Sequence, residues 1–274
     1  MHKLTCKTTL TAIAAVLALL LAGTANMWAQ QQPAKNKPYL VIDYMKILPG
    51  KTADAAQVEQ RIWAPIHQER VKTGKIDFWR VYDCQFPSGS ENEYDYVTIT
   101  QYPSFAELDA PYGGFTAETL ARIHPSMKLG ELTTRTEAVR KLVREDVVSV
   151  EQTTSGWPGT KVGVLNAVYV KTQPGRAADL DRIERDFFLP LFQELVKQGQ
   201  AAAWAFTLLR FPYPASSPYD SLSLNGYESL AKAGSEAMPE AFEAKWKEAN
   251  TILNAARVRV RVQLWGFQAG TRPK

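Results

Sequence analysis

The sequence contains one long segment twice. When the chain is aligned with itself at an offset of 125 residues, 44–106 matches 169–231 without a gap, and 21 of the 63 aligned positions are identical. A duplication of this size means that one supersecondary unit has been copied, which constrains the fold more than any local propensity does. The identical pairs include Pro49/Pro174, Gly50/Gly175, Pro65/Pro190, Gly74/Gly199, Trp79/Trp204, Tyr94/Tyr219 and Tyr102/Tyr227.

Both copies predict the same order of elements. In the first, apolar patterning predicts strands at 39–48, 76–86, 94–102 and 147–150, and helical segments at 52–73 and 104–144. In the second, it predicts strands at 162–171, 202–211, 219–224 and 258–267, and helices at 178–198 and 239–256. Each half therefore reads βαββαβ, the ferredoxin-like pattern, with both helices on one face of an antiparallel sheet.

The bare face of each sheet needs a cover, which the second copy supplies. We expect an α+β fold in which two ferredoxin-like βαββαβ repeats pack sheet to sheet as an intrachain pseudo-dimeric barrel. The expected divisions are a signal peptide (1–29), a linker (30–38), a first domain (39–153), a second linker (154–160), a second domain (161–268) and a tail (269–274).

The first segment has the pattern of an export signal. A positive start (His2, Lys3 and Lys7) precedes an apolar run over 8–23, and small residues at Ala25 and Ala29 offer cleavage sites. The run is shorter than the ~20 residues of a spanning helix, although a retained anchor stays open. We expect a periplasmic or secreted protein with no stable membrane insertion after cleavage.

The composition excludes several classes of protein. The net charge of +4 falls to about +2 without the two signal lysines, so nothing indicates a nucleic-acid partner. Cys84 is the only cysteine after processing, which rules out an intrachain disulfide and favours a buried thiol. Two remaining histidines and one cysteine at no ligand spacing predict no metal site.

The element order, the Pro-Gly turn after the first strand (Pro49-Gly50, Pro174-Gly175) and the duplication resemble the dimeric α+β barrel superfamily. That superfamily includes antibiotic-biosynthesis-monooxygenase-like, EthD-like and NIPSNAP-like proteins. The resemblance implies two sheets facing each other in a barrel, normally as a homodimer and here within one chain. It implies that cofactor-free oxygenation, isomerisation or haem binding are activities to consider, but no family catalytic motif is matched.

Differences between the halves point to candidate site residues. Strand alternation places Arg80 and Tyr82 on a face opposite Trp79, and we expect that face to line the barrel interior. The same reasoning puts Tyr94 and Tyr96 in the interior and Val97 and Ile99 against the helices. The second half carries smaller residues at several matching positions, which leaves room for a ligand unless side chains fill the barrel: Ala203, Ala205, Thr207 and Ser221.

Two further candidates flank a proline inside the first helix. Trp63 and His67 are four residues apart on one face beside Pro65, where we expect a kink. Their counterparts are Phe188 and Phe192. A histidine that the other copy lacks could titrate or ligate haem, and the alternative is a structural histidine.

The sequence supports three hypotheses about function. The leading one is an exported protein that binds a small aromatic or lipophilic molecule in the barrel between the halves. The alternatives are a cofactor-free monooxygenase or isomerase, or a haem-binding enzyme, of the same superfamily, and a non-catalytic structural module. No cofactor is predicted, with haem held open, and the chain is expected as a monomer with an internal pseudo-dimer or as a further homo-oligomer. The candidate ligand-binding residues are Arg80, Tyr82, Tyr94, Tyr96, His67 and Trp63.

Overall fold

The computed structural model describes residues 37–89, 92–212, 217–235 and 237–272. The expected signal peptide and all but the last two residues of the first linker lie outside the described residues. Residues 37–274 form one compact unit. None of its described helices is long and apolar enough to cross a membrane.

The first half has the expected βαββαβ order, with its first helix divided into three pieces. Its elements are β1 (Tyr39–Ile47), α2 (Thr52–Gln57), η1 (Val58–Trp63), α3 (Ala64–Lys72), β2 (Phe78–Phe86), β3 (Tyr96–Tyr102), η2 (Phe105–Leu108), α4 (Ala117–Ile123), α5 (Leu129–Glu137) and β4 (Arg140–Thr153). The last strand is longer than predicted, because it begins where we expected helix to continue.

The second half repeats this order. Its elements are β5 (Val164–Thr172), α6 (Ala177–Ile183), η3 (Glu184–Phe188), α7 (Leu189–Lys197), β6 (Ala203–Phe211), β7 (Ser221–Tyr227), α8 (Leu230–Gly234), α9 (Glu240–Ala256) and β8 (Arg257–Gly270). Strand β8 runs into the segment that we expected to be a tail.

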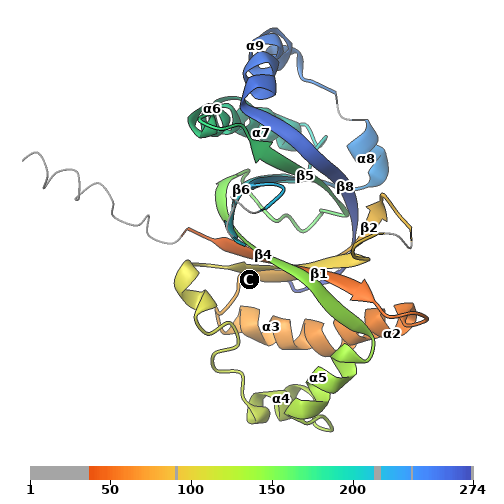
Figure 1. The fold of residues 1–274 in the computed structure, drawn as a ribbon. Helices are drawn as coiled ribbons and strands as arrows, with labels where there is room; N and C mark the ends of the chain where they lie inside the picture. Colours follow the sequence, from red (N-terminus) through yellow and green to blue (C-terminus); the bar gives the residue numbers. More distant parts are fainter. Residues whose placement is uncertain (1–36, 90–91, 213–216, 236, 273–274) are drawn as a thin grey trace, which may run out of the picture. The chain divides into compact units, whose positions relative to one another are not determined.

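The eight strands form a closed barrel in the order β1-β3-β2-β8-β5-β7-β6-β4 (Figure 1). Each half contributes four neighbouring strands, and the halves join where β2 pairs with β8 and β4 pairs with β6. The length of β4 and β8 (14 residues each) lets each pair with its own half and with the other half. Closure leaves no unpaired sheet edge. In Figure 1 the helices of the first half cover one side of the barrel and α6, α7 and α9 cover the other.

The repeated glycines and prolines set the local geometry. Gly50 and Gly74 have positive φ (73° and 77°) at the turn before α2 and after the end of α3, as the residue tolerating that conformation should. Pro65 cannot donate a backbone bond, and a π-helical segment (η1) directly precedes its helix α3. The second half repeats this arrangement with η3 before Pro190. The irregularity expected at these prolines therefore takes the form of a π-helical turn.

Candidate functional site

The sheet divides the six predicted site residues into two groups. Arg80, Tyr82 and Tyr94 lie in the barrel interior, where Tyr82 and Tyr94 belong to the main buried cluster. Trp63 and His67 lie on the outer side of the sheet, under the helices. The six residues therefore do not line one site.

The prediction for Tyr96 was wrong. Tyr96 packs under the helices and its hydroxyl donates to Glu59 Oε1 at 2.6 Å, whereas Val97 and Ile99 face the barrel interior. Tyr94 lies before β3 begins, so the alternation that linked it to Tyr96 does not apply across the intervening residue. That residue, Asp95, accepts a bond from the backbone N–H of Ile47 at 2.7 Å and holds the chain at the entrance to the strand.

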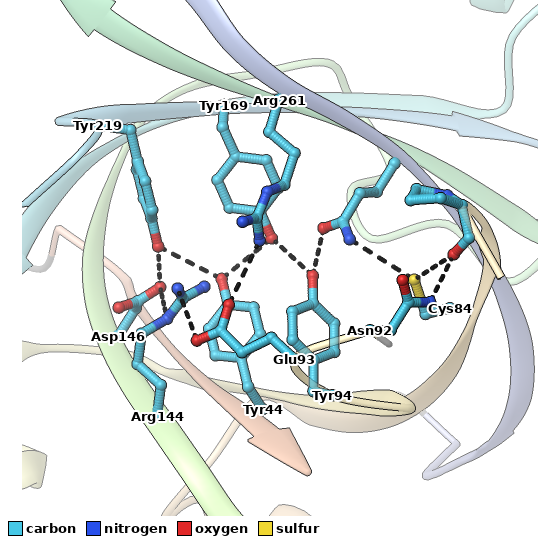
Figure 2. Close-up of polar contacts among 12 residues, drawn as sticks. Tyr44, Cys84, Asn92, Glu93, Tyr94, Arg144, Asp146, Tyr169, Tyr219 and Arg261 are labelled. Carbon is cyan, nitrogen blue, oxygen red and sulfur yellow. Dashed lines mark hydrogen bonds and ion pairs between the residues drawn. The ribbon is translucent and has the colours of Figure 1, made fainter. Parts of the chain in front are cut away.

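Side chains fill the centre of the barrel. Tyr44 and Tyr169 occupy matching positions in the repeat, and their hydroxyls lie 3.2 Å apart. Tyr94 lies 3.3 Å from Tyr169 and Tyr219 lies 3.5 Å from Tyr44, oxygen to oxygen, so that four buried tyrosines form one chain of hydrogen bonds (Figure 2). These tyrosine side chains therefore occupy the barrel interior, where the sequence predicted a ligand site between the halves.

The ends of the tyrosine chain differ between the halves. Tyr219 donates to the buried carboxylate of Asp146 (Figure 2). Tyr94 donates to the side-chain carbonyl of Gln263. Arg144 packs over the Tyr44 ring at 3.9 Å and lies 3.5 Å from an Asp146 oxygen. Burial raises the pKa of Asp146 above its ordinary value. These contacts connect the two halves through the barrel interior.

Arg80 closes one end of the barrel. Its guanidinium donates to the carbonyls of Pro158 at 3.3 Å and Gly159 at 2.5 Å, both in the segment that joins the halves, and to Tyr82 Oη at 3.2 Å. Trp265, fully buried in the same interior cluster, adds an indole where small residues had suggested free space. Arg80 and Tyr82 therefore have structural partners. Cys84, expected to be buried, is half-buried, and burial raises the pKa of its thiol.

A cavity lies instead between the sheet and the helices of the first half. Its volume is about 440 Å³, and it is bounded by β1, β3 and β4, by η1 and α3, and by the segment around η2. The walls combine aromatic side chains with polar and charged groups, and such a combination can bind a small molecule. Lining residues include Asp43, Trp63, His67, Trp79, Thr98, Tyr102, Phe105, Tyr112, Arg140 and Glu145.

Asp43 is one of the titratable groups of this cavity. It lies on β1 with Thr98 and Glu145 as its cross-strand neighbours, and the Thr98 hydroxyl donates to Oδ2 at 2.8 Å. Burial raises the pKa of Asp43 to about 7, the Thr98 bond opposes the rise, and the negative charge of Glu145 adds to it. A carboxyl group that titrates near neutral pH is suited to general acid–base chemistry.

His67 provides a hydrogen-bond donor. Its ring stacks between the indoles of Trp63 (centroids 5.5 Å apart) and Trp79 (4.6 Å), and its Nδ1 lies 2.8 Å from Arg70 Nη1. A guanidinium only donates, so Nδ1 accepts and the proton of the neutral ring is on Nε2. Burial and the charges of Arg70 and Arg140 hold the pKa of His67 well below its ordinary value. Among the described residues Nε2 has no hydrogen-bond partner, so it is available to a molecule in the cavity.

This arrangement does not fit haem ligation by His67. An axial histidine needs a free nitrogen lone pair, and a ligating ring normally donates its other N–H to a carboxylate or a carbonyl. In His67 the Nδ1 lone pair is taken by Arg70, and Nε2 carries the proton. His124, the other described histidine, uses Nε2 to contact the Ile62 carbonyl at 3.1 Å. The described residues contain no group of three His, Cys, Asp or Glu side chains that could hold a metal ion.

Arg70 holds in place the segment that covers the cavity. Besides contacting His67, it donates to Tyr102 Oη at 2.9 Å and to the Pro111 carbonyl at 2.5 Å, and its guanidinium lies 4.4 Å from the centre of the Tyr112 ring. It thereby fixes the segment that carries Tyr112 over the cavity. Neither Arg70 nor Asp43 was predicted from the sequence, although an acidic residue within a mostly apolar strand was an available signal for Asp43.

A buried ion pair anchors the first helix to the sheet. Arg140 lies 2.7 Å from Glu59, and in the second half Arg257 lies 2.8 Å from Glu184. Because both halves have this pair, we interpret it as a structural feature of the repeat. Burial raises the pKa of Glu59 above its ordinary value and that of Glu184 to about 7.

No protein-family model matches this chain, and a search of curated proteins finds no match. Solved structures do resemble it. A proposed monooxygenase of Lactobacillus acidophilus NCFM is 8% identical, with a TM-score of 0.57, over 86% of this chain and 96% of that one. A proposed monooxygenase of Fusobacterium nucleatum subsp. nucleatum ATCC 25586 is 6% identical, with a TM-score of 0.51, over 87% and 95%.

A haem-binding protein of Thermus thermophilus is similar over 85% of this chain and 91% of its own, at 9% identity and a TM-score of 0.46. At these identities the likeness concerns the fold. Together with the strand order, the two proposed monooxygenases show that the chain has the dimeric α+β barrel fold, with both halves in one polypeptide.

Proposed function

We propose that this chain is an exported, cofactor-independent enzyme that removes a proton from a small planar substrate and passes the resulting carbanion to dioxygen. The observation that carries the proposal is Asp43, a carboxyl group with a pKa of about 7 in the aromatic-walled cavity of the first half. The proposed monooxygenase activity of the two structurally similar proteins adds support.

The walls of the cavity favour an aromatic or lipophilic substrate. Trp63, Trp79, Tyr102 and Tyr112 contribute apolar ring atoms to the lining, and a volume of about 440 Å³ suits a molecule of two or three fused rings. An aryl ketone with a methylene group between its ring and its carbonyl, or between its rings, has a C–H acidic enough for a carboxylate base. The proposed ligand class is the one that the sequence predicted, but the proposed site lies on the helix side of the sheet instead of in the barrel interior.

Asp43 and His67 have complementary roles in this reaction. The Asp43 carboxylate takes the C–H proton, and the electron pair of that bond delocalises onto the carbonyl oxygen. The His67 Nε2–H donates to this developing oxyanion, a role that requires a neutral ring. Dioxygen then adds to the carbanion carbon. In total, one CH₂ group and one O₂ become one carbonyl group and one water, so no external electron donor is needed.

Two measurements on the purified protein separate the steps. With anthrone as the probe, hydrogen–deuterium exchange of its methylene in D₂O without oxygen reports proton removal, and oxygen uptake in air reports the complete reaction. We expect Asp43→Asn to lower both rates by about 10²-fold or more, the range for loss of a general base. Asp43→Val is the matched control for folding, because Val168 occupies the equivalent position of the second half.

The outcomes are distinct. Exchange without oxygen uptake would contradict the oxygenase and leave an isomerase-type proton transfer. Wild-type protein that accelerates neither process with any aryl ketone of this size, while remaining folded, would contradict the proposed function.

A further inference from the structure

A second cavity occupies the matching position in the second half. Its volume is about 370 Å³, and it lies between the sheet and the helical segments η3, α7 and α9. Eight of its lining residues stand 125 positions after a lining residue of the first cavity, so the duplication has preserved the place of the cavity. These pairs are Val41/Asn166, Asp43/Val168, Glu59/Glu184, Trp63/Phe188, His67/Phe192, Thr98/Ser223, Thr100/Asn225 and Tyr102/Tyr227.

The chemistry of the second cavity is different. Val168 and Phe192 replace the carboxyl group and the imidazole, so the cavity has neither the base nor the donor of the first. Its Arg257 is paired with Glu184 at 2.8 Å. The polar groups that the second half adds include side-chain amides, and among these Asn166 on β5 lies directly across from Asn225 on β7.

The two amides present an acceptor and a donor. Asn166 Oδ1 is buried and has no hydrogen-bond partner in the described part of the chain. Ser223 Oγ accepts from Trp204 Nε1 at 3.0 Å, so its own proton goes to Asn225 Oδ1 at 2.9 Å. That bond fixes the Asn225 amide and leaves its Nδ2 without a partner among the described residues. A buried carbonyl beside an uncommitted N–H is the arrangement of a site that lacks its ligand.

We infer that the second cavity binds a neutral planar compound that carries a hydrogen-bond donor beside an acceptor, such as a primary aromatic amide or a lactam. The N–H of the ligand donates to Asn166 Oδ1, and its carbonyl accepts from Asn225 Nδ2. The ring of the ligand packs among Phe188, Tyr227 and Trp246, which line the cavity. At the position of Asp43 this site carries Val168, and its Glu184 is paired with Arg257.

Benzamide is the probe, and benzoate is its anionic isostere. The readout is the methyl signal of Met238, which lines this cavity, in protein carrying ¹³C-methyl methionine and assigned with Met238→Leu. We expect benzamide to shift this signal with an affinity of about millimolar, as suits a fragment of its size, and benzoate to bind at least about tenfold more weakly. The exposed Arg259 at the rim would favour benzoate instead, so the comparison discriminates between the two modes of binding.

Two variants test the amides with residues that the first half already uses. Asn166→Val and Asn225→Thr install the counterparts Val41 and Thr100, and each should weaken benzamide binding about tenfold. Asp43→Asn should leave it unchanged, which separates this inference from the proposed reaction. Benzoate binding as tightly as benzamide, or unchanged benzamide binding in both folded variants, would overturn the inference.

Discussion

Replacing Asp43 with asparagine should stabilise the folded protein above neutral pH. The pKa of Asp43 rises from its ordinary value of 3.8 to about 7 on folding, a change of about three units, and each unit corresponds to about 1.4 kcal/mol. Because the folded state holds this proton more tightly than the unfolded chain, the wild type loses stability as the pH rises from about 4 to about 7. The loss is up to about 4 kcal/mol at pH 8. Asparagine has no such cost, and its carbonyl can still accept the Thr98 bond.

Urea unfolding of both proteins at pH values from 4 to 8 measures this difference. We expect the free energies of unfolding to converge near pH 4 and the variant to be more stable by about 2–4 kcal/mol at pH 8, with equal m-values. Asp54→Asn, which removes an exposed carboxylate, controls for net charge. A difference that does not change with pH, or a variant less stable than the wild type at pH 8, would refute the assignment of Asp43 as the group that titrates near 7.

His67→Phe installs the residue that the second half has at this position, where Phe192 stacks on the Trp204 indole at 5.4 Å. The variant should therefore fold normally, while kcat/KM for the proposed reaction falls about 10²-fold. An unchanged rate would exclude the donor role of His67. Arg80→Met leaves two loop carbonyls without their donor, and thermal unfolding should show a loss of about 2–3 kcal/mol with no change in KM. A change in KM alone would instead place Arg80 at the substrate. Glu184→Gln leaves Arg257 buried without its charge partner and should lower the free energy of unfolding in urea by about 3–5 kcal/mol. The double variant that also carries Arg257→Met should lose less stability. Equal losses would show that the two side chains are not coupled.

The duplication made the fold predictable from the sequence. Pro49-Gly50 and its repeat at Pro174-Gly175 located the first turn of each half, and the βαββαβ order followed from the apolar patterns between such signals. The bounds of β4 were harder to predict from the sequence. Its first residues are mostly exposed and charged, and they become strand because β1 offers a pairing edge, which the sequence does not display.

The site was only partly predictable. Helical spacing placed Trp63 and His67 on one face of the first helix, and both side chains line the cavity of the first half. The prediction for Tyr96 failed because one irregular residue, Asp95, reverses the alternation on which it rested. The pKa of Asp43 is raised mainly by burial, the charge of Glu145 adds to the rise and the Thr98 bond opposes it, so this pKa is a property of the assembled sheet.

Joining the halves in one polypeptide frees them from having to change together. In an assembly of two identical chains, any substitution appears twice, so a buried acid would burden both partners. Here a single gene encodes both sides of the β2–β8 and β4–β6 seams, and each side can acquire mutations that the other never receives. The repeat can therefore keep its shared framework while its two copies diverge toward separate tasks.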